Sequence, residues 1–317
     1  MKDKIAVIGA GFMGPGIAQV FATAGHPVHL SNRSSGKLAT VIDQVHANLM
    51  AMAEYGLVDA AEIPRILSRI SLTTDLAEAC SNASVVIETI TESLQLKQDL
   101  FVQLDRLCLP EVILCSNTSV ISITQIGEKT EHPERIVGAH FYQPPYLVPL
   151  VEVTRTEHTL PQHMDTIVEL MAACGKVPVR VQKDVPGFIA NRMQHALWRE
   201  AFSLIDEGIC DAETIDLAVS NSFGIRLPVL GPVANADLVG LDLTLAIHDY
   251  VLPHLSASPN PSTTLRSHVT EGHLGFKTKS GFLTWTDEEM AETKKQVTTH
   301  LLRTLSQLKS NAMPMKN

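Results

Sequence analysis

The chain has 317 residues, a formal net charge of −9, and 45% hydrophobic and 19% charged residues. This composition is typical of a globular protein, and the length favours two domains. The negative charge argues against nucleic acid or an anionic membrane as the main partner. No apolar run is long enough to cross a membrane. The charged N-terminus runs straight into a predicted strand, so we expect no signal peptide.

The five cysteines are scattered and odd in number, without C-x-x-C or Cys/His ligand spacing. We interpret them as free thiols of a cytoplasmic protein and predict neither a disulfide framework nor a metal site.

A glycine-rich loop organises the N-terminal part of the chain. Residues 5–8 form a short apolar run typical of a buried strand, a G-x-G-x-x-G loop follows, and a helix (17–23) and a strand (27–30) complete the unit. In a dinucleotide-binding fold, the three glycines permit a tight turn, the approach of a pyrophosphate, and close packing of the helix on the strand. The residues expected to bind the cofactor here are Gly9, Gly11, Phe12, Met13 and Gly14.

The second predicted strand runs into Asn32 and Arg33. An acidic residue at this point would accept hydrogen bonds from the adenosine ribose and repel a 2′-phosphate. A neutral amide beside a guanidinium suits a 2′-phosphate better, so we predict that both residues contact the cofactor. The alternative is an exposed turn whose side chains bind nothing.

Strands and helices alternate up to about residue 185, and the remainder is mostly helical. Further strands are predicted at 84–88, 112–115, 136–140, 150–154 and 178–181, and helices at 37–49, 188–205, 212–219, 233–252 and 287–308, the last with Thr286 or Asp287 as N-cap. A short helix is expected after Asp59, and another through Phe101 and Leu104. The fold class is therefore α/β, with a Rossmann-type domain (1–185) and an all-α domain (186–317) joined at a Pro-Gly linker.

Polar side chains gather at the carboxyl ends of two predicted strands, where open α/β sheets bind ligands. Glu92 and Lys97 follow the strand at 84–88, and their residue types alone favour a solvated helix start. The run Ser116-Asn117-Thr118-Ser119 can cap a helix or line a pocket.

Of the thirteen histidines, His140 alone ends a predicted strand on the ligand side of the sheet. Oxidation of an alcohol needs a base for the hydroxyl proton, and imidazole is suited to this at neutral pH. Glu152 lies on the opposite face of the next strand from Val151 and Val153, so it faces either water or a polar site. A tight connection would bring its carboxylate to the imidazole and fix the tautomer. The alternative for His140 is a purely structural role.

The chain resembles the L-3-hydroxyacyl-CoA dehydrogenase family over nearly its full length. The resemblance is carried by the segments 9–14, 17–20, 116–119, 138–141, 150–153, 184–192 (Asp-Val-Pro-Gly-Phe-Ile-Ala-Asn-Arg) and 274–282. It implies an oxidoreductase that interconverts a 3-hydroxy and a 3-oxo group with a nicotinamide cofactor. It also implies a Rossmann-type domain and a helical domain that forms a homodimer.

Carried over position by position, the resemblance implies that His140 is the catalytic base and Glu152 its partner. It implies that Ser119 and Asn191 form hydrogen bonds around the reacting hydroxyl and the nicotinamide. The other cofactor contacts that it implies are Glu92, Lys97 and Asn117.

Three departures from the family pattern bear on cofactor and substrate. The family's ribose-binding Asp is Asn32 here, which opens NADP beside NAD. Gln143 replaces the usual Asn before a Pro-Pro pair, and this resembles the branch that acts on small hydroxy acids (gulonate and carnitine dehydrogenases, lambda-crystallin). The stretch between Lys37 and Arg65, where acyl-CoA members hold the nucleotide end of CoA, contains no Lys or Arg, although phosphates favour both.

We therefore predict an NAD- or NADP-dependent oxidoreductase, acting on a 3-hydroxyacyl-CoA, as in fatty acid metabolism, or on a small free 3-hydroxy acid. The alternative is a catalytically silent, crystallin-like or cofactor-binding protein on the same fold. All four catalytic-type positions are filled, which argues against that alternative.

Overall fold

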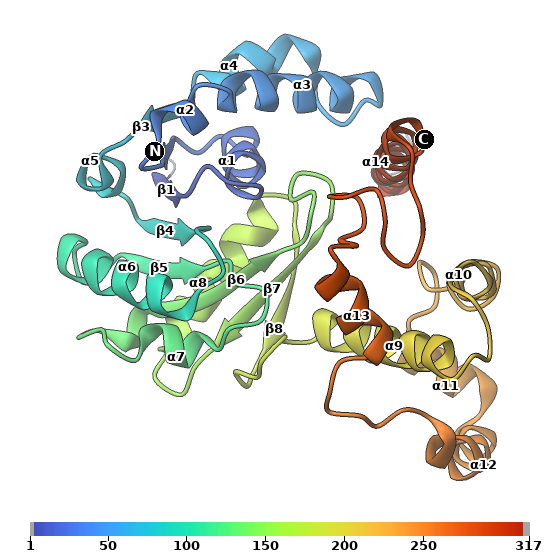
Figure 1. The fold of residues 1–317 in the computed structure, drawn as a ribbon. Helices are drawn as coiled ribbons and strands as arrows, with labels where there is room; N and C mark the ends of the chain where they lie inside the picture. The colour runs from blue at the N-terminus through green and yellow to red at the C-terminus, as the bar shows by residue number, and fades with distance from the viewer. Residues whose placement is uncertain (1–2, 313–317) are drawn as a thin grey trace, which may run out of the picture. The chain divides into compact units, whose positions relative to one another are not determined.

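The computed structural model describes residues 3–312, and an eight-stranded sheet forms the centre of its N-terminal part (Figure 1). The strand order is β3-β2-β1-β4-β5-β6-β7-β8, and every neighbouring pair is parallel except β6 and β7. The strands are β1 (Ile5–Ile8), β2 (Val28–Ser31), β3 (Ile70–Thr73), β4 (Val85–Glu88), β5 (Ile113–Ser116), β6 (Ile136–Phe141), β7 (Leu150–Arg155) and β8 (Val177–Val181). This order, with helices in the connections, confirms the Rossmann-type α/β fold.

Helices cover both faces of the sheet, because side chains of successive strand residues point to opposite faces. In β1, Ile5 and Val7 belong to one apolar core, and Ala6 and Ile8 belong to the other. The first core is completed by α1 (Gly14–Thr23), α3 (Val41–Glu54), α4 (Ile63–Leu67) and α8 (Pro161–Ala173). The second is completed by α5 (Leu76–Cys80), α6 (Leu94–Leu107) and α7 (Ile123–Gly127).

Several elements differ from the sequence-based expectation, and the helices α5, α8 and α13 (Thr263–Glu271) were not predicted. The edge strand β3 was not predicted, because its four residues alternate apolar and polar side chains. The predicted helix at 37–49 is two helices, α2 (Ser35–Leu38) and α3. The predicted helix at 233–252 is divided into α11 (Pro232–Val239) and α12 (Leu241–Val251) by Gly240, whose φ of +102° ends the first helix.

Contacts divide the chain into two compact units, while the predicted boundary after residue 185 stays a prediction. One unit takes in the chain up to Asn191 and from Val297 onward, and the other spans Arg192–Gln296. The helical part consists of α9 (Ala190–Asp206), α10 (Ala212–Ser220), α11, α12, α13 (Thr263–Glu271) and α14 (Asp287–Ala312), which confirms an all-α C-terminal region. Within the described residues, no helix has both the length and the apolar character that a membrane crossing requires.

The long helix α14 begins and ends with side-chain hydrogen bonds. Thr286 Oγ1 accepts from the Glu289 amide, and the Glu289 carboxylate accepts from the Thr286 amide at 2.7 Å, so Thr286 is the N-cap as predicted. Near its other end, Lys309 Nζ donates to the carbonyls of Gly56 and Leu57 at 2.9 and 3.3 Å. The last turns of α14 are thereby fixed beside the end of α3.

Candidate active site

The glycine-rich loop connects β1 to α1 in the geometry that the sequence predicts. Gly9 has a φ of +115°, and a Cβ at Gly14 would lie 1.8 Å from the Gly9 carbonyl oxygen, so both positions require glycine. Gly11 is different, because a Cβ there would meet nothing within 4 Å. Its missing side chain therefore leaves open space at the start of α1, where backbone N–H groups favour a phosphate. These residues fit the pyrophosphate of a dinucleotide.

The antiparallel pairing of β6 and β7 brings His140 and Glu152 together. The two residues are directly opposite in the register, and His140 Nδ1 lies 2.8 Å from Glu152 Oε2. The other carboxylate oxygen accepts hydrogen bonds from the Ile189 and Ala190 amides, each at 2.9 Å. Glu152 is fully buried and His140 is 3% exposed. Of the two predicted orientations for Glu152, the polar site is the one observed.

The hydrogen bonds to Glu152 determine the protonation of the pair. Burial raises the pKa of Glu152, but the bonds from His140, Ala190 and Ile189 outweigh it and hold the pKa below its usual value. An ionised carboxylate only accepts hydrogen bonds, so Nδ1 of His140 carries the proton. Nε2 is then the basic nitrogen, and it has no hydrogen-bond partner among the residues that the structure describes.

Two aromatic residues that the sequence analysis did not identify pack against the imidazole. The Tyr142 and Phe188 ring centroids lie 4.6 and 5.7 Å from that of His140. The Tyr142 hydroxyl is buried without a hydrogen-bond partner in the described part of the chain. Burial raises its pKa, and the charge of Glu152 adds to the effect. No motif indicated Tyr142, although it follows His140 by only two residues.

Ser119 and Asn191 lie together in the structure, while their hydrogen bonds to substrate and nicotinamide stay a prediction. Asn191 Nδ2 donates to the Ser119 carbonyl at 3.0 Å. Glu92 Oε1 accepts from Thr118 Oγ1, the Ser119 amide and the Val120 amide at 2.5, 3.0 and 3.3 Å. The Ser119 backbone is thus held from both sides. Its hydroxyl makes no hydrogen bond to any other described residue, which leaves it available to a ligand.

Lys97 is a buried cation, not the solvated side chain that its residue type suggested. It is 1% exposed, and its Nζ lies 2.6 Å from Glu88 Oε1 and 3.4 Å from Glu92 Oε2. Burial raises the pKa of Glu88, while Lys97, the Ser116 hydroxyl and the Ile90 amide oppose this rise. Glu88 was missed by the sequence analysis. The available signal was an acidic residue at the end of the apolar run that forms β4.

The remaining predicted cofactor residues lie near the carboxyl ends of β2 and β5. Asn117 Oδ1 accepts from the Phe141 amide at 2.8 Å, so it joins the end of β5 to the end of β6. Asn32 Oδ1 accepts from the Ala10 amide at 3.2 Å, which ties the end of β2 to the glycine-rich loop. Phe12 is 76% exposed and Arg33 is exposed. Their contact with a cofactor stays a prediction.

Comparisons with known proteins agree over both parts of the chain. Residues 4–185 match the NAD binding domain of 3-hydroxyacyl-CoA dehydrogenase, and residues 187–285 match its C-terminal domain. A 5-formyl-3-hydroxy-2-methylpyridine 4-carboxylate 5-dehydrogenase from Mesorhizobium japonicum is 34% identical over 292 residues, which cover 91% of this chain and 93% of that protein. A 3-hydroxybutyryl-CoA dehydrogenase from Clostridioides difficile is 36% identical over 280 residues, which cover 88% and 98%.

Solved structures give the same result. The crystal structure of a 5-formyl-3-hydroxy-2-methylpyridine 4-carboxylic acid 5-dehydrogenase, described as an NAD⁺-dependent dismutase, has a TM-score of 0.90 and 31% identity. The match covers 98% of this chain and 99% of that one. A 3-hydroxybutyryl-CoA dehydrogenase from Escherichia coli has a TM-score of 0.75 and 35% identity, over 90% of this chain and 60% of the other.

Substitutions of Gly14 and Gly11 allow the contribution of the loop to stability to be measured separately from its contribution to cofactor binding. We expect Gly14→Ala to lower the free energy of unfolding by about 1–3 kcal/mol, because its Cβ overlaps the Gly9 carbonyl. Gly11→Ala should change it by less than about 0.5 kcal/mol and yet weaken NAD binding at least tenfold. Urea denaturation of the apoprotein and calorimetric titration with NAD measure the two effects. Undiminished NAD binding by Gly11→Ala would contradict the assignment of this loop.

Proposed function

The chain belongs to the 3-hydroxyacyl-CoA dehydrogenase family, and on this premise we propose that His140 is the general base of an NAD-dependent oxidation of a 3-hydroxy group. The observation that carries the proposal is the buried His140–Glu152 pair, with a 2.8 Å contact between Nδ1 and the carboxylate. Bound NAD supplies the acceptor for the hydride that leaves the substrate carbon. The chain's own residues supply everything else that the step requires.

The proton of the substrate hydroxyl passes to Nε2 of His140. This nitrogen is basic because Glu152 holds the other ring proton on Nδ1. The imidazolium that forms is stabilised by the ionised carboxylate 2.8 Å away, while two backbone amides hold that carboxylate in place. In the reverse direction the same imidazolium returns the proton to the oxygen of a 3-oxo substrate.

Ser119 and Asn191 orient the reacting oxygen in this proposal. The hydroxyl of Ser119 is the free donor of the pair. The Ser119 backbone that carries it is fixed by Glu92 and Asn191. A fixed donor near the hydroxyl keeps the C–H bond directed at the cofactor, and such positioning lowers the barrier without new chemistry. Phe188 and Tyr142 exclude water from one side of the imidazole.

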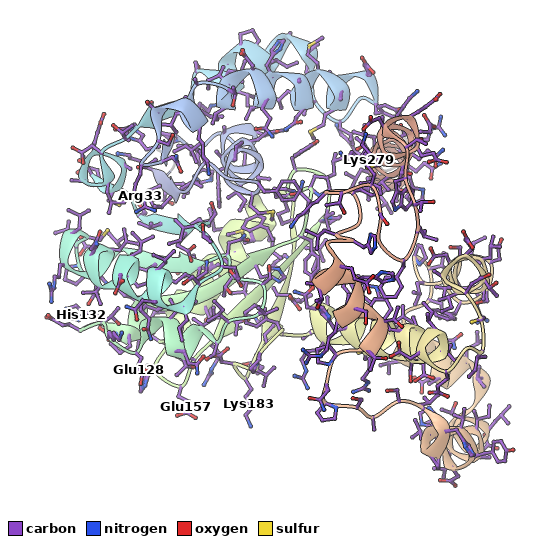
Figure 2. All side chains as sticks on the ribbon, viewed as in Figure 1. Arg33, Glu128, His132, Glu157, Lys183 and Lys279 are labelled. Atoms are coloured by element: carbon purple, nitrogen blue, oxygen red, sulfur yellow. The ribbon has the colours of Figure 1, made fainter. Side chains whose placement is uncertain are left out.

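His140→Gln and Glu152→Gln test the base and its partner separately. We expect His140→Gln to reduce kcat by roughly 10²–10⁴-fold, because the base is lost. Glu152→Gln should reduce it to a similar extent, because an amide that donates to Nδ1 selects the wrong tautomer. NAD affinity should stay within twofold in both variants. Glu157→Gln, an exposed carboxylate beyond the end of β7 (Figure 2), is the matched control. Near-normal turnover of His140→Gln would contradict the mechanism.

We further propose a small free hydroxy acid, rather than a CoA thioester, as the preferred substrate. The segment from α3 to α4 has three exposed carboxylates, those of Asp43, Glu54 and Asp59. Its first basic residue, Arg65, is engaged by Glu62 at 3.1 Å. An acidic surface of this kind repels the phosphates of CoA. The relative from Mesorhizobium japonicum, by its name, acts on a free pyridine carboxylate, which supports the same substrate class.

A direct comparison of free acids with a thioester tests the substrate class. We expect kcat/KM with NAD to be at least tenfold higher for the best of a panel of free acids, including 3-hydroxybutyrate, than for 3-hydroxybutyryl-CoA. Formation of reduced cofactor is followed by its absorbance. A preference for the thioester over every free acid would overturn this part of the proposal and leave the role of His140 untouched.

We also propose that the helical part forms a homodimer. None of the described residues in α9 to α13 is buried, although these helices carry many large apolar side chains. The most exposed are Leu217, Val233, Leu238 and Tyr250 in the helices, at 65–79%, and Ile225 and Val229 between α10 and α11, at 73% and 91%. So much apolar surface is unusual for a monomer, and a second copy of the chain would cover it.

Light scattering after size exclusion measures the assembly. We expect twice the monomer mass, and we expect Val233→Asp to shift the protein toward monomer. Val177→Asp, at an exposed valine of β8, places the same charge outside the helical part and should leave the dimer intact. A monomeric wild-type protein at micromolar concentration would contradict this proposal.

A further inference from the structure

The segment after β2 joins the glycine-rich loop through one side chain. Asn32 Oδ1 accepts from the Ala10 amide at 3.2 Å, and Asn32 Nδ2 donates to the Ser34 carbonyl at 3.0 Å. Both ends of the amide are therefore engaged within the protein. In a dinucleotide-binding sheet, the end of this strand faces the adenosine ribose. No carboxylate stands at this position to repel an anion on the 2′-hydroxyl.

The side chains that follow Asn32 include hydrogen-bond donors that suit a phosphate and have no partner among the described residues. Arg33 and Lys37 are exposed, and neither forms an ion pair or a side-chain hydrogen bond with any described residue. Ser34 has the extended backbone of a helix N-cap, with φ −100° and ψ 116°, but its hydroxyl caps no backbone amide. Figure 2 labels Arg33 on the side of the first unit where α2 and α5 lie. A guanidinium, an ammonium and a hydroxyl form the donor set that a phosphate dianion recruits.

The acidic groups closest in the fold are already engaged. The Asn32 amide donates to the Thr73 carbonyl at 3.2 Å, so the end of β3 adjoins this segment. Beyond β3, the Asp75 carboxylate accepts from the Ala77 and Glu78 amides at 2.7 and 3.3 Å, and the Glu78 carboxylate accepts from Thr73 Oγ1. These bonds engage both carboxylates at the start of α5, and neither acid forms an ion pair with Arg33 or Lys37 among the described residues.

We infer that Arg33, Lys37 and the Ser34 hydroxyl form a 2′-phosphate site, so that the chain binds NADP in addition to NAD. The inference rests on the proposed function, because it requires a dinucleotide on the glycine-rich loop. The hydrogen bond from Ala10 to Asn32 links that loop to the segment, and the ribose joins the pyrophosphate to the 2′-position. The basic side chains thus lie where a 2′-phosphate would be.

Calorimetric titration of the full-length protein with NADP and with NAD, in the absence of substrate, tests the inference. We expect Arg33→Ala to weaken NADP binding at least tenfold and NAD binding less than twofold, and Lys37→Ala to weaken NADP binding selectively by a smaller factor. Lys129→Ala, an exposed lysine on a different part of the first unit, should change neither. NADP affinity should also fall more steeply with added KCl than NAD affinity, because of its additional charge.

A second variant adds a negative charge at the site instead of removing a positive one. Asn32→Asp should weaken NADP binding at least tenfold, because a carboxylate repels the 2′-phosphate, while NAD binding should be unchanged or tighter. Equal losses for both cofactors in Arg33→Ala, or wild-type binding of NAD without NADP, would overturn the inference and leave the proposed function intact. Binding of neither dinucleotide would overturn both.

Discussion

The carboxylate of Glu152 is the point on which the site depends. One of its oxygens holds the imidazole of His140, and the other accepts the amides of Ile189 and Ala190. The next residue, Asn191, holds the Ser119 carbonyl, so the His140–Glu152 pair and the Ser119–Asn191 pair are connected through two backbone amides. A buried charge is tolerated only when its hydrogen bonds are satisfied, and here they are. The same bonds that keep Glu152 ionised therefore also hold the start of α9.

A second polar network, buried at Glu88 and Lys97 and 40% exposed at Glu92, extends this arrangement to the neighbouring strands. Glu92 fixes the Ser119 backbone, and Lys97 is held between Glu92 and Glu88. Each charge in this network has an opposite charge or several donors, so loss of one member would leave another uncompensated in a region of low dielectric. His140, Glu152, Ser119 and Asn191 are thus held by a connected polar framework, and the Phe188 ring packs against the imidazole. In the proposed reaction, such preorganisation would reduce the reorganisation that hydride and proton transfer require.

Features set by local pattern were predictable from the sequence, whereas features set by tertiary pairing were missed. Strands buried on both faces are continuous apolar runs and were predicted, but the edge strand β3 carries no such run. Periodicity placed Glu152 away from its neighbouring valines, but only the antiparallel register of β6 and β7 shows that it faces His140. Residue type alone indicated a solvated Lys97, because its buried partner, Glu88, lies at the end of an apolar strand and was not recognised. The packing of Tyr142 on the imidazole could not be read from any motif.

The two ends of the cofactor site are built differently, and this has a consequence for specificity. The catalytic end is buried and fixed by two connected networks, so a substitution there disturbs several groups at once. The adenosine end is an exposed segment joined to the glycine-rich loop by the hydrogen bond between Ala10 and Asn32. The charges on Arg33 and Lys37 take part in no bond within the described chain. Substitutions at these positions break no hydrogen bond or ion pair among the described residues, so in the proposed site the choice between NAD and NADP can change while the geometry of His140 stays the same.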